Sequence, residues 1–105
     1  MVVTFEKEYL KELYETGKCN SKKHRYQPEV ARKYRRSIET LIAAEGIEQL
    51  YRLNSVHYEV LSGDKAGISS IRVDMQYRIE FTVRDEGSEP VITVCNILEL
   101  SNHYK

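Results

Sequence analysis

The sequence contains few of the features that mark exported or membrane proteins. Only two cysteines occur among its 105 residues, Cys19 and Cys95, so a disulfide framework is not expected and reduced thiols are the default. No apolar run approaches the ~18 residues that a membrane-spanning helix needs. The first ten residues already include Glu6 and Glu8, too early for a secretory signal peptide. These absences predict a soluble protein of the cytoplasm with no membrane partner.

Net charge is also absent, because 16 Lys and Arg residues balance 16 Asp and Glu residues. This neutrality argues against a protein whose whole surface binds polyanions. A hydrophobic content of 41% and an aromatic content of 10% suffice for a core and do not indicate disorder. A chain of this length is expected to form one domain over residues 1–105, burying roughly two thirds of its unfolded surface.

The sequence signatures of several kinds of catalytic site are missing as well. His24, His57 and His103 show none of the spacings typical of metal sites, and the two cysteines are far apart, so no metal or other cofactor is expected. The GDKAG segment at residues 63–67 forms a tight turn but opens no helix, which leaves nucleoside triphosphate binding unsupported. Cys95 lies in an apolar strand pattern, which is typical of a structural thiol.

The first half of the sequence predicts two amphipathic helices after a short apolar run, residues 2–5, that suits a strand. In residues 6–16, apolar and aromatic side chains recur at helical spacing, and Gly17 stands where this helix would stop. The second and stronger helix begins at Pro28 and covers residues 28–44, and Gly46 ends this segment. Its apolar stripe consists of Val30, Ala31, Tyr34, Ile38, Leu41 and Ile42.

From about residue 57 the pattern changes to four predicted β-strands, with turns at residues 63–67 and 85–90. The third strand, QYRIEFTV, alternates apolar residues with polar ones, Arg78 and Glu80 among them, so its polar face would be wet. The fourth, VITVCNIL, is apolar throughout, which favours a central strand covered on both faces. The expected fold is α+β, with two N-terminal helices packed on one face of a small antiparallel meander sheet and the other face free.

A basic segment is hidden within the neutral total. Residues 18–36 carry eight cations against Glu29 alone, a local net charge of +7. Such a segment is the footprint of contact with nucleic acid or with an acidic partner, although a solvated helix face with a basic loop has the same composition. Its cations are Lys18, Lys22, Lys23, Arg25, Arg32, Lys33, Arg35 and Arg36.

The order of a strand, two helices and a meander containing GDKAG, SSIRV, QYRIEF and the tail SNHYK resembles the RelE/ParE superfamily of bacterial toxins, most closely its HigB-like branch. The resemblance covers the whole chain, and residues 60–105 are its most specific part. It implies a type II toxin-antitoxin toxin that, as a metal-free endoribonuclease, cleaves mRNA in the ribosomal A site and inhibits translation. The implied partners are mRNA, the ribosome and a cognate helix-turn-helix antitoxin of the HigA type, through which alone the toxin would reach operator DNA.

The chemistry that the resemblance implies needs a base for the ribose 2′-OH proton, an acid for the departing 5′ oxygen and a cation for the phosphate. Arg78 in QYRIEF matches the family's strand arginine and is expected to stabilise phosphate charge, and Arg72 could share its face. HigB-like toxins place acidic, tyrosine and histidine residues where this tail has Asn102, His103 and Tyr104. The resemblance implies that Asn102 contacts substrate, that His103 is an acid or base and that Tyr104 stacks on a base or orients a proton.

The chain departs from the family pattern just before GDKAG. HigB-like enzymes have a histidine there and a lysine three residues later, whereas this chain has Glu59 and Ser62. His57 or Lys65 could substitute, or Glu59 could itself act as the base. The remaining substrate-binding candidates are Lys65, Arg72, Lys33 and Arg36.

Two other hypotheses remain open. The missing histidine and lysine favour a ParE-like toxin that is not a nuclease and acts on DNA gyrase. The second alternative is a catalytically decayed module that only binds the antitoxin.

Overall fold

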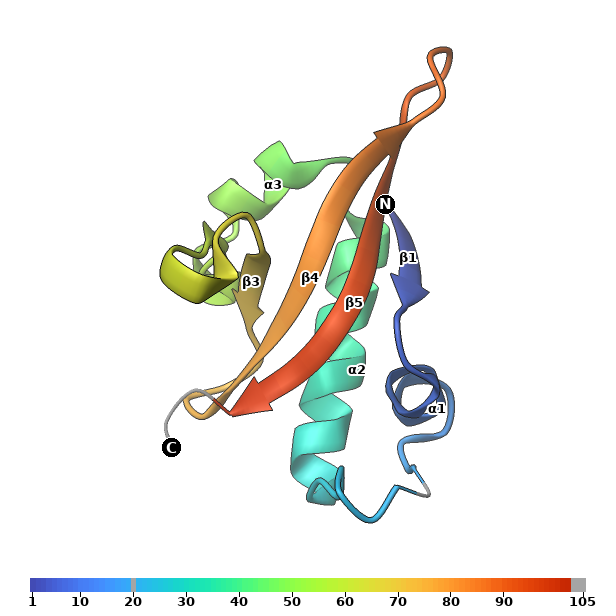
Figure 1. Ribbon diagram of the computed structural model, residues 1–105, viewed down its shortest axis with the longest axis vertical. Coiled ribbons are helices and arrows are strands. Elements are labelled where there is room, and N and C mark those ends of the chain that lie inside the picture. The colour runs from blue at the N-terminus through green and yellow to red at the C-terminus, as the bar shows by residue number, and fades with distance from the viewer. Residues whose placement is uncertain (20, 103–105) are drawn as a thin grey trace.

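The computed structural model describes residues 1–19 and 21–102. Within these residues, five strands form one sheet (Figure 1). Three helices of these residues pack against one face of the sheet. The strand order is β1-β5-β4-β3-β2. The strands are β1 (Val2–Phe5), β2 (Glu59–Val60), β3 (Ser69–Arg72), β4 (Tyr77–Glu86) and β5 (Ile92–Asn102), and the helices are α1 (Glu8–Thr16), α2 (Pro28–Ala43) and α3 (Ile47–Arg52).

The sheet confirms the predicted α+β fold, because β2, β3, β4 and β5 form an antiparallel meander with helices on one face. The short strand β1 adds an edge to this meander. It pairs in parallel with β5, with Val3 opposite Cys95 and Phe5 opposite Ile97. β5 is therefore an interior strand, as its apolar sequence predicted, and Figure 1 shows α2 crossing behind β4 and β5.

A β-bulge interrupts β5. Ile97 pairs with Phe81, but Glu99 pairs with the preceding residue of β4, which leaves Leu98 as an extra residue. The bulge keeps both Ile97 and Leu100 buried on the helix side, whereas Glu99 is exposed on the other face. Val94 and Cys95, neighbours within the predicted run and therefore on opposite faces, are both buried, so the prediction that β5 is covered on both faces is confirmed there. This cover does not extend to Glu99, directly after the run.

The two predicted helices form, and the ends of both follow from backbone geometry. α1 ends at Gly17, whose φ of 79° is left-handed and whose N–H donates to the carbonyl of Leu13 at 2.9 Å. α2 starts at Pro28, whose missing N–H costs nothing in the first turn. It ends at Ala43, within one residue of the predicted end, because the chain becomes extended at Ala44, whose side chain is buried in the core.

The apolar stripe of α2 packs against the sheet and against α1. The hydroxyl of Tyr34 donates to the carbonyl of Leu10 at 2.8 Å, which joins the two helices. Burial raises the pKa of Tyr34 above its usual range, so the phenol keeps the proton that it donates. Ile42 is exposed at the edge of the stripe and Val30 is half-buried, while the other members are fully buried: Ala31, Tyr34, Ile38 and Leu41.

Replacing Tyr34 with phenylalanine tests the link between α1 and α2. Tyr34→Phe keeps the ring but leaves the Leu10 carbonyl without its donor, so the free energy of unfolding should fall by roughly 1–2 kcal/mol. Urea denaturation measures the change. Tyr51→Phe is the matched control, because Tyr51 is 60% exposed and its stability should stay near that of the wild type. Equal losses in the two variants would contradict a role for the buried hydrogen bond.

Candidate active site

Strand register brings a set of polar side chains onto the face of the sheet that the helices leave free. Arg72 of β3 pairs with Arg78 of β4. Two residues before Arg72 in β3, Ser70 pairs with Glu80, which lies two residues after Arg78 in β4. Glu59 of β2 pairs with Ser70. Because paired residues of an antiparallel sheet share a face, these five side chains lie on the side opposite α2. The shared face of Arg72 and Arg78 confirms what their alternation with apolar neighbours predicted.

A small hollow of about 70 Å³ lies on this face. It brings together three of the catalytic candidates and one of the substrate-binding candidates that the sequence indicated. Two guanidinium groups, an imidazole and a carboxylate can together bind a phosphate and move a proton. The hollow is lined by His57, Glu59, Ser70, Arg72 and Arg78.

The arginine pair is unfavourable for the sheet itself. Two like charges directly opposite each other on neighbouring strands reduce stability. Arg72 and Arg78 occupy such a position, and both line the hollow. An anion bound between two guanidinium groups would offset their repulsion and accept their hydrogen bonds. The pair therefore favours a binding role over a structural one.

His57 enters the hollow from an unusual backbone conformation. Its φ of 46° and ψ of 54° lie in the left-handed region, which is uncommon for residues other than glycine and clusters at functional sites. Its Nε2 lies 3.4 Å from Nη1 of Arg72. Because arginine only donates hydrogen bonds, Nε2 must be the acceptor, which puts the imidazole proton on Nδ1. In this form the lone pair of Nε2 is occupied by the contact with Arg72, so His57 can act as a base only after Arg72 turns away from it.

Glu80 is buried, although the alternation of β4 predicted a wet side chain. Only 3% of its side-chain surface is exposed. Its carboxylate accepts hydrogen bonds from Nζ of Lys65 at 2.8 and 2.9 Å and from Nε of Arg78 at 2.9 Å. Lys65 reaches Glu80 from the 3-10 turn Gly63–Lys65, which is remote from β4 in the sequence. Strand periodicity contains no signal for such a contact, so the sequence did not single out Glu80.

Arg78 also lines a second hollow, of about 360 Å³, next to the Gly63–Lys65 turn. Ser62 and Lys65 lie on its wall, so both positions discussed for the missing family lysine are close to Arg78. A larger hollow of about 510 Å³ lies between α3 and the outer part of β4 and β5, and its charge does not suit phosphate. Three acidic residues and one cation line it: Glu45, Glu48, Asp85 and Arg52.

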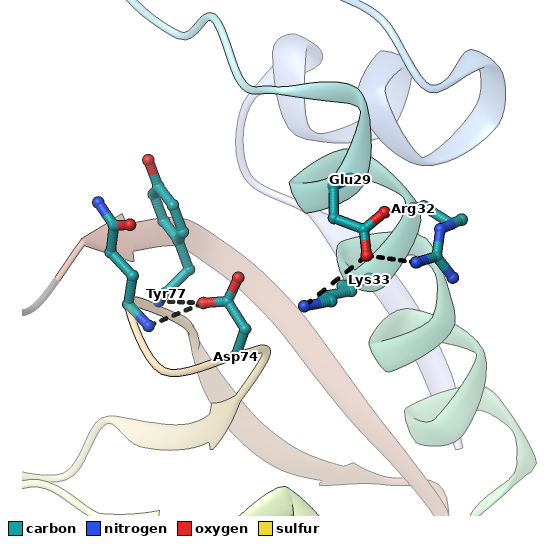
Figure 2. Close-up of polar contacts among 6 residues, drawn as sticks. Glu29, Arg32, Lys33, Asp74 and Tyr77 are labelled. Carbon is teal, nitrogen blue, oxygen red and sulfur yellow. Dashed lines mark hydrogen bonds and ion pairs between the residues drawn. The ribbon is translucent and has the colours of Figure 1, made fainter.

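The turn that precedes Arg78 is fixed by Asp74 (Figure 2). One carboxylate oxygen, Oδ1, accepts hydrogen bonds from the backbone N–H groups of Gln76 and Tyr77, both at 2.8 Å. The ring of Tyr77 packs against the core, with its centre 5.7 Å from that of Tyr26 in an edge-on contact. These contacts hold the start of β4, and with it the backbone of Arg78.

Of the three candidates in the C-terminal tail, only Asn102 lies within the described residues, and it does not line the hollow. Asn102 pairs with Tyr77, which neighbours Arg78, so it lies on the helix side of the sheet. His103 and Tyr104 lie outside the described residues, and their roles stay predictions.

The candidates of the basic helix lie on α2, which packs against the opposite face of the sheet. Figure 2 shows Glu29 beside both Lys33, at 3.8 Å, and Arg32. Arg36 is exposed further along the same helix. Any contact that Lys33 and Arg36 make with a nucleic acid is therefore separate from the hollow.

Residues 1–19 and 21–102 contain no cluster of three or more His, Cys, Asp or Glu side chains that could hold a metal ion. Burial raises the pKa of the Cys95 thiol to about 11, so this thiol stays protonated near neutral pH and is a poor nucleophile. In the same described residues, no helix is long and apolar enough to cross a membrane.

The family model of the RelE-like toxin of type II toxin-antitoxin system HigB matches residues 3–92. The chain belongs to this family. The match confirms the resemblance that GDKAG and QYRIEF indicated, and a type II toxin has a cognate antitoxin as its partner. No curated protein matches the chain.

A solved structure described as the YoeB/ParE toxin from Agrobacterium tumefaciens is similar to this toxin, with a TM-score of 0.56. The alignment covers 99% of this chain and 100% of that chain, at 20% sequence identity. At this level of identity the likeness shows the fold, which is of the RelE/ParE type, and not a shared target.

Arg72→Thr tests whether the arginine pair serves binding at the expense of stability. Threonine suits a strand, and the change removes a like-charge pair, so the free energy of unfolding should rise or stay within about 0.5 kcal/mol of the wild type. Urea denaturation measures it. Ile71→Ala, on the buried side of the same strand, is the positive control and should lose roughly 2–5 kcal/mol. A comparable loss in Arg72→Thr would show that the pair stabilises the fold.

Proposed function

We propose that the protein is a metal-free endoribonuclease that cleaves mRNA in the ribosomal A site and thereby inhibits translation. The observation that supports this function is the hollow that joins Arg72 and Arg78 to His57 and Glu59 on the free face of the sheet. Cations that bind a phosphate, with proton-transfer groups beside them, are what cleavage of a phosphodiester by its own 2′-OH needs. Membership of the HigB family supports the same function.

The reaction begins when Glu59, or His57 once Arg72 has turned from Nε2 to the phosphate, takes the proton of a ribose 2′-OH. The 2′ oxygen then forms a bond to the adjacent phosphorus, in line with the bond to the 5′ oxygen, which breaks. An acid returns a proton to the departing 5′ oxygen, and a 2′,3′-cyclic phosphate remains on the upstream product. Arg72 and Arg78 stabilise the negative charge that grows on the non-bridging oxygens. His103 is the proposed acid.

The basic segment, residues 18–36, supplies contacts with ribosomal RNA on the helix side of the molecule. Lys33 and Arg36 would bind phosphates there, while Lys65 and Tyr104 would contact the mRNA. Each phosphate contact by Lys or Arg releases counterions, so binding to the ribosome should weaken steeply as salt rises.

Replacing Arg78 tests the nuclease. Arg78→Ala should lower the rate of mRNA cleavage on programmed ribosomes by on the order of 100-fold, the usual effect of losing one donor to a transition-state oxyanion. Single-turnover cleavage measures the rate. Arg84→Ala is the matched control, because Arg84 lies on the same face of the same strand but outside the hollow. Arg78→Lys, which keeps the charge, replaces the alanine variant if that one does not fold.

Equal activity of folded Arg78→Ala and wild-type protein would refute the assignment of this residue. The departure from the family pattern at Glu59 and Ser62 favours one competing function, inhibition of DNA gyrase by a ParE-like toxin. In that case induced cells would show DNA-damage signalling with intact transcripts, and the purified protein would not cut mRNA on ribosomes.

We also propose that the cognate antitoxin is a helix-turn-helix protein of the HigA type, encoded by a neighbouring reading frame, and that it alone contacts operator DNA. Expression of the toxin should arrest growth, and co-expression of that neighbour should restore it. The Arg78→Ala toxin should still bind the antitoxin in a pull-down, which separates neutralisation from catalysis. Growth arrest that persists with the neighbour present would contradict the pairing.

A further inference from the structure

In residues 1–19 and 21–102, Glu80 is the only buried carboxylate, and it lies at the centre of the sheet. We propose that Glu80 is a positioning residue of the active site, which holds the Arg78 guanidinium and the Lys65 ammonium in fixed places at the two neighbouring hollows. This role rests on the proposed ribonuclease function, since it concerns the cations that would bind the RNA backbone.

The burial of Glu80 is hard to explain by stability. Removing a carboxylate from water is costly, and a buried ion pair seldom stabilises a fold more than apolar side chains of similar size. Glu80 pairs with Ser70 on one side and with Glu99 on the other, and neither is a cation that would require its charge. The negative charge of Glu80 is therefore explained by its ion pairs with Lys65 and Arg78 and not by its neighbours in the sheet.

The contacts show how one carboxylate can place both cations. Its Oε2 accepts from Nε of Arg78 at 2.9 Å and from Nζ of Lys65 at 2.8 Å, and its Oε1 accepts from Lys65 again at 2.9 Å. Because Arg78 is bound through Nε, its two terminal nitrogens stay available for a phosphate, and no partner for them occurs within the described residues. Without the carboxylate, the two cations would repel each other.

Arg78 lines both hollows, so its orientation matters to each of them. Glu80 restrains the guanidinium from the protein side, while the β3–β4 register restrains the backbone of the same residue. Lys65 belongs to the Gly63–Lys65 turn, so its bidentate contact with Glu80 also ties that turn to β4. One side chain thus sets the distance between cations from two separate segments.

β4 contains a matched comparison. Arg84 and Glu86 repeat the arrangement of Arg78 and Glu80, with the arginine two residues before the glutamate on the same strand and their charged groups 3.3 Å apart. In this pair 57% and 48% of the side-chain surfaces are exposed, and neither residue lines either hollow. Glu86→Gln is therefore the control for removing a strand carboxylate beside an arginine.

The test is a double-mutant cycle on single-turnover cleavage of ribosome-bound mRNA. Glu80→Gln keeps the size of the side chain but offers one acceptor oxygen and turns an amide N–H₂ toward two cations. It should lower the cleavage rate by roughly tenfold to 100-fold, because a displacement of about 1 Å can have an effect of that size. Added to Arg78→Ala, it should cause a smaller loss than in the wild type, because only Lys65 is then left for Glu80 to position. Glu86→Gln should cleave like the wild type.

A merely structural role would give the opposite pattern, in which the losses from Glu80→Gln and Arg78→Ala multiply. That result, or wild-type cleavage by folded Glu80→Gln, overturns the proposal. If Glu80→Gln does not fold, Glu80→Asp keeps the charge, moves the carboxylate by one methylene and enters the same cycle. Urea denaturation of each variant shows that the rates come from folded protein.

A second measurement does not depend on catalysis. In the wild type the Nε–H proton of Arg78 should exchange slowly with water in NMR spectra, because a buried carboxylate accepts it, and the exchange should become faster in Glu80→Gln. Unchanged exchange overturns the positioning role. If the wild-type protein itself does not cut mRNA, the nuclease function fails, and the exchange rate alone decides whether Glu80 holds Arg78.

Discussion

The antiparallel pairing of β3, β4 and β5 is the constraint on which the other features depend. It sends alternate side chains of each strand to the helices or to the free face, so the core and the candidate active site are two sides of the same three strands. A shift of β3 by one residue against β4 would bury Arg72, expose Ile71 and end the pairing of Arg72 with Arg78. The hydrophobic core thus specifies the register, and the register places the arginines.

The free face is organised by charge as much as by shape. Two guanidinium groups lie opposite each other, and one carboxylate, removed from water, holds the second of them together with a lysine. Neither arrangement is expected to stabilise the sheet: the facing guanidinium groups repel each other, and burial of the carboxylate carries a desolvation penalty. Both arrangements would suit the binding of a polyanion, because its negative charge would pair with the guanidinium groups of Arg72 and Arg78.

Much of this fold could be predicted from the sequence, because periodicity is a local property. The two helices, the meander and the shared face of Arg72 and Arg78 all follow from spacing along the chain. What could not be predicted depends on segments that are distant in the sequence. The parallel pairing of β1 with β5 is one example, and the burial of Glu80, which depends on Lys65 reaching it from a turn, is another. The side on which Asn102 lies depends on how β5 is aligned with β4, which its composition does not reveal.

The extra residue in β5 has a consequence for how the chain can change in length. Ile97 and Leu100 both face the helices, although three positions separate them and strict alternation would place them on opposite faces. The bulge at Leu98 allows this, because it adds one unpaired residue between them. A chain lacking Leu98 would form an uninterrupted ladder with Leu100 still facing inward. A chain with one more residue at this point would also alternate without a bulge, but the residues after it would move two positions along β4, so that Leu100 would pair with Tyr77 instead of Ile79. The strand should therefore accept shortening here more readily than lengthening.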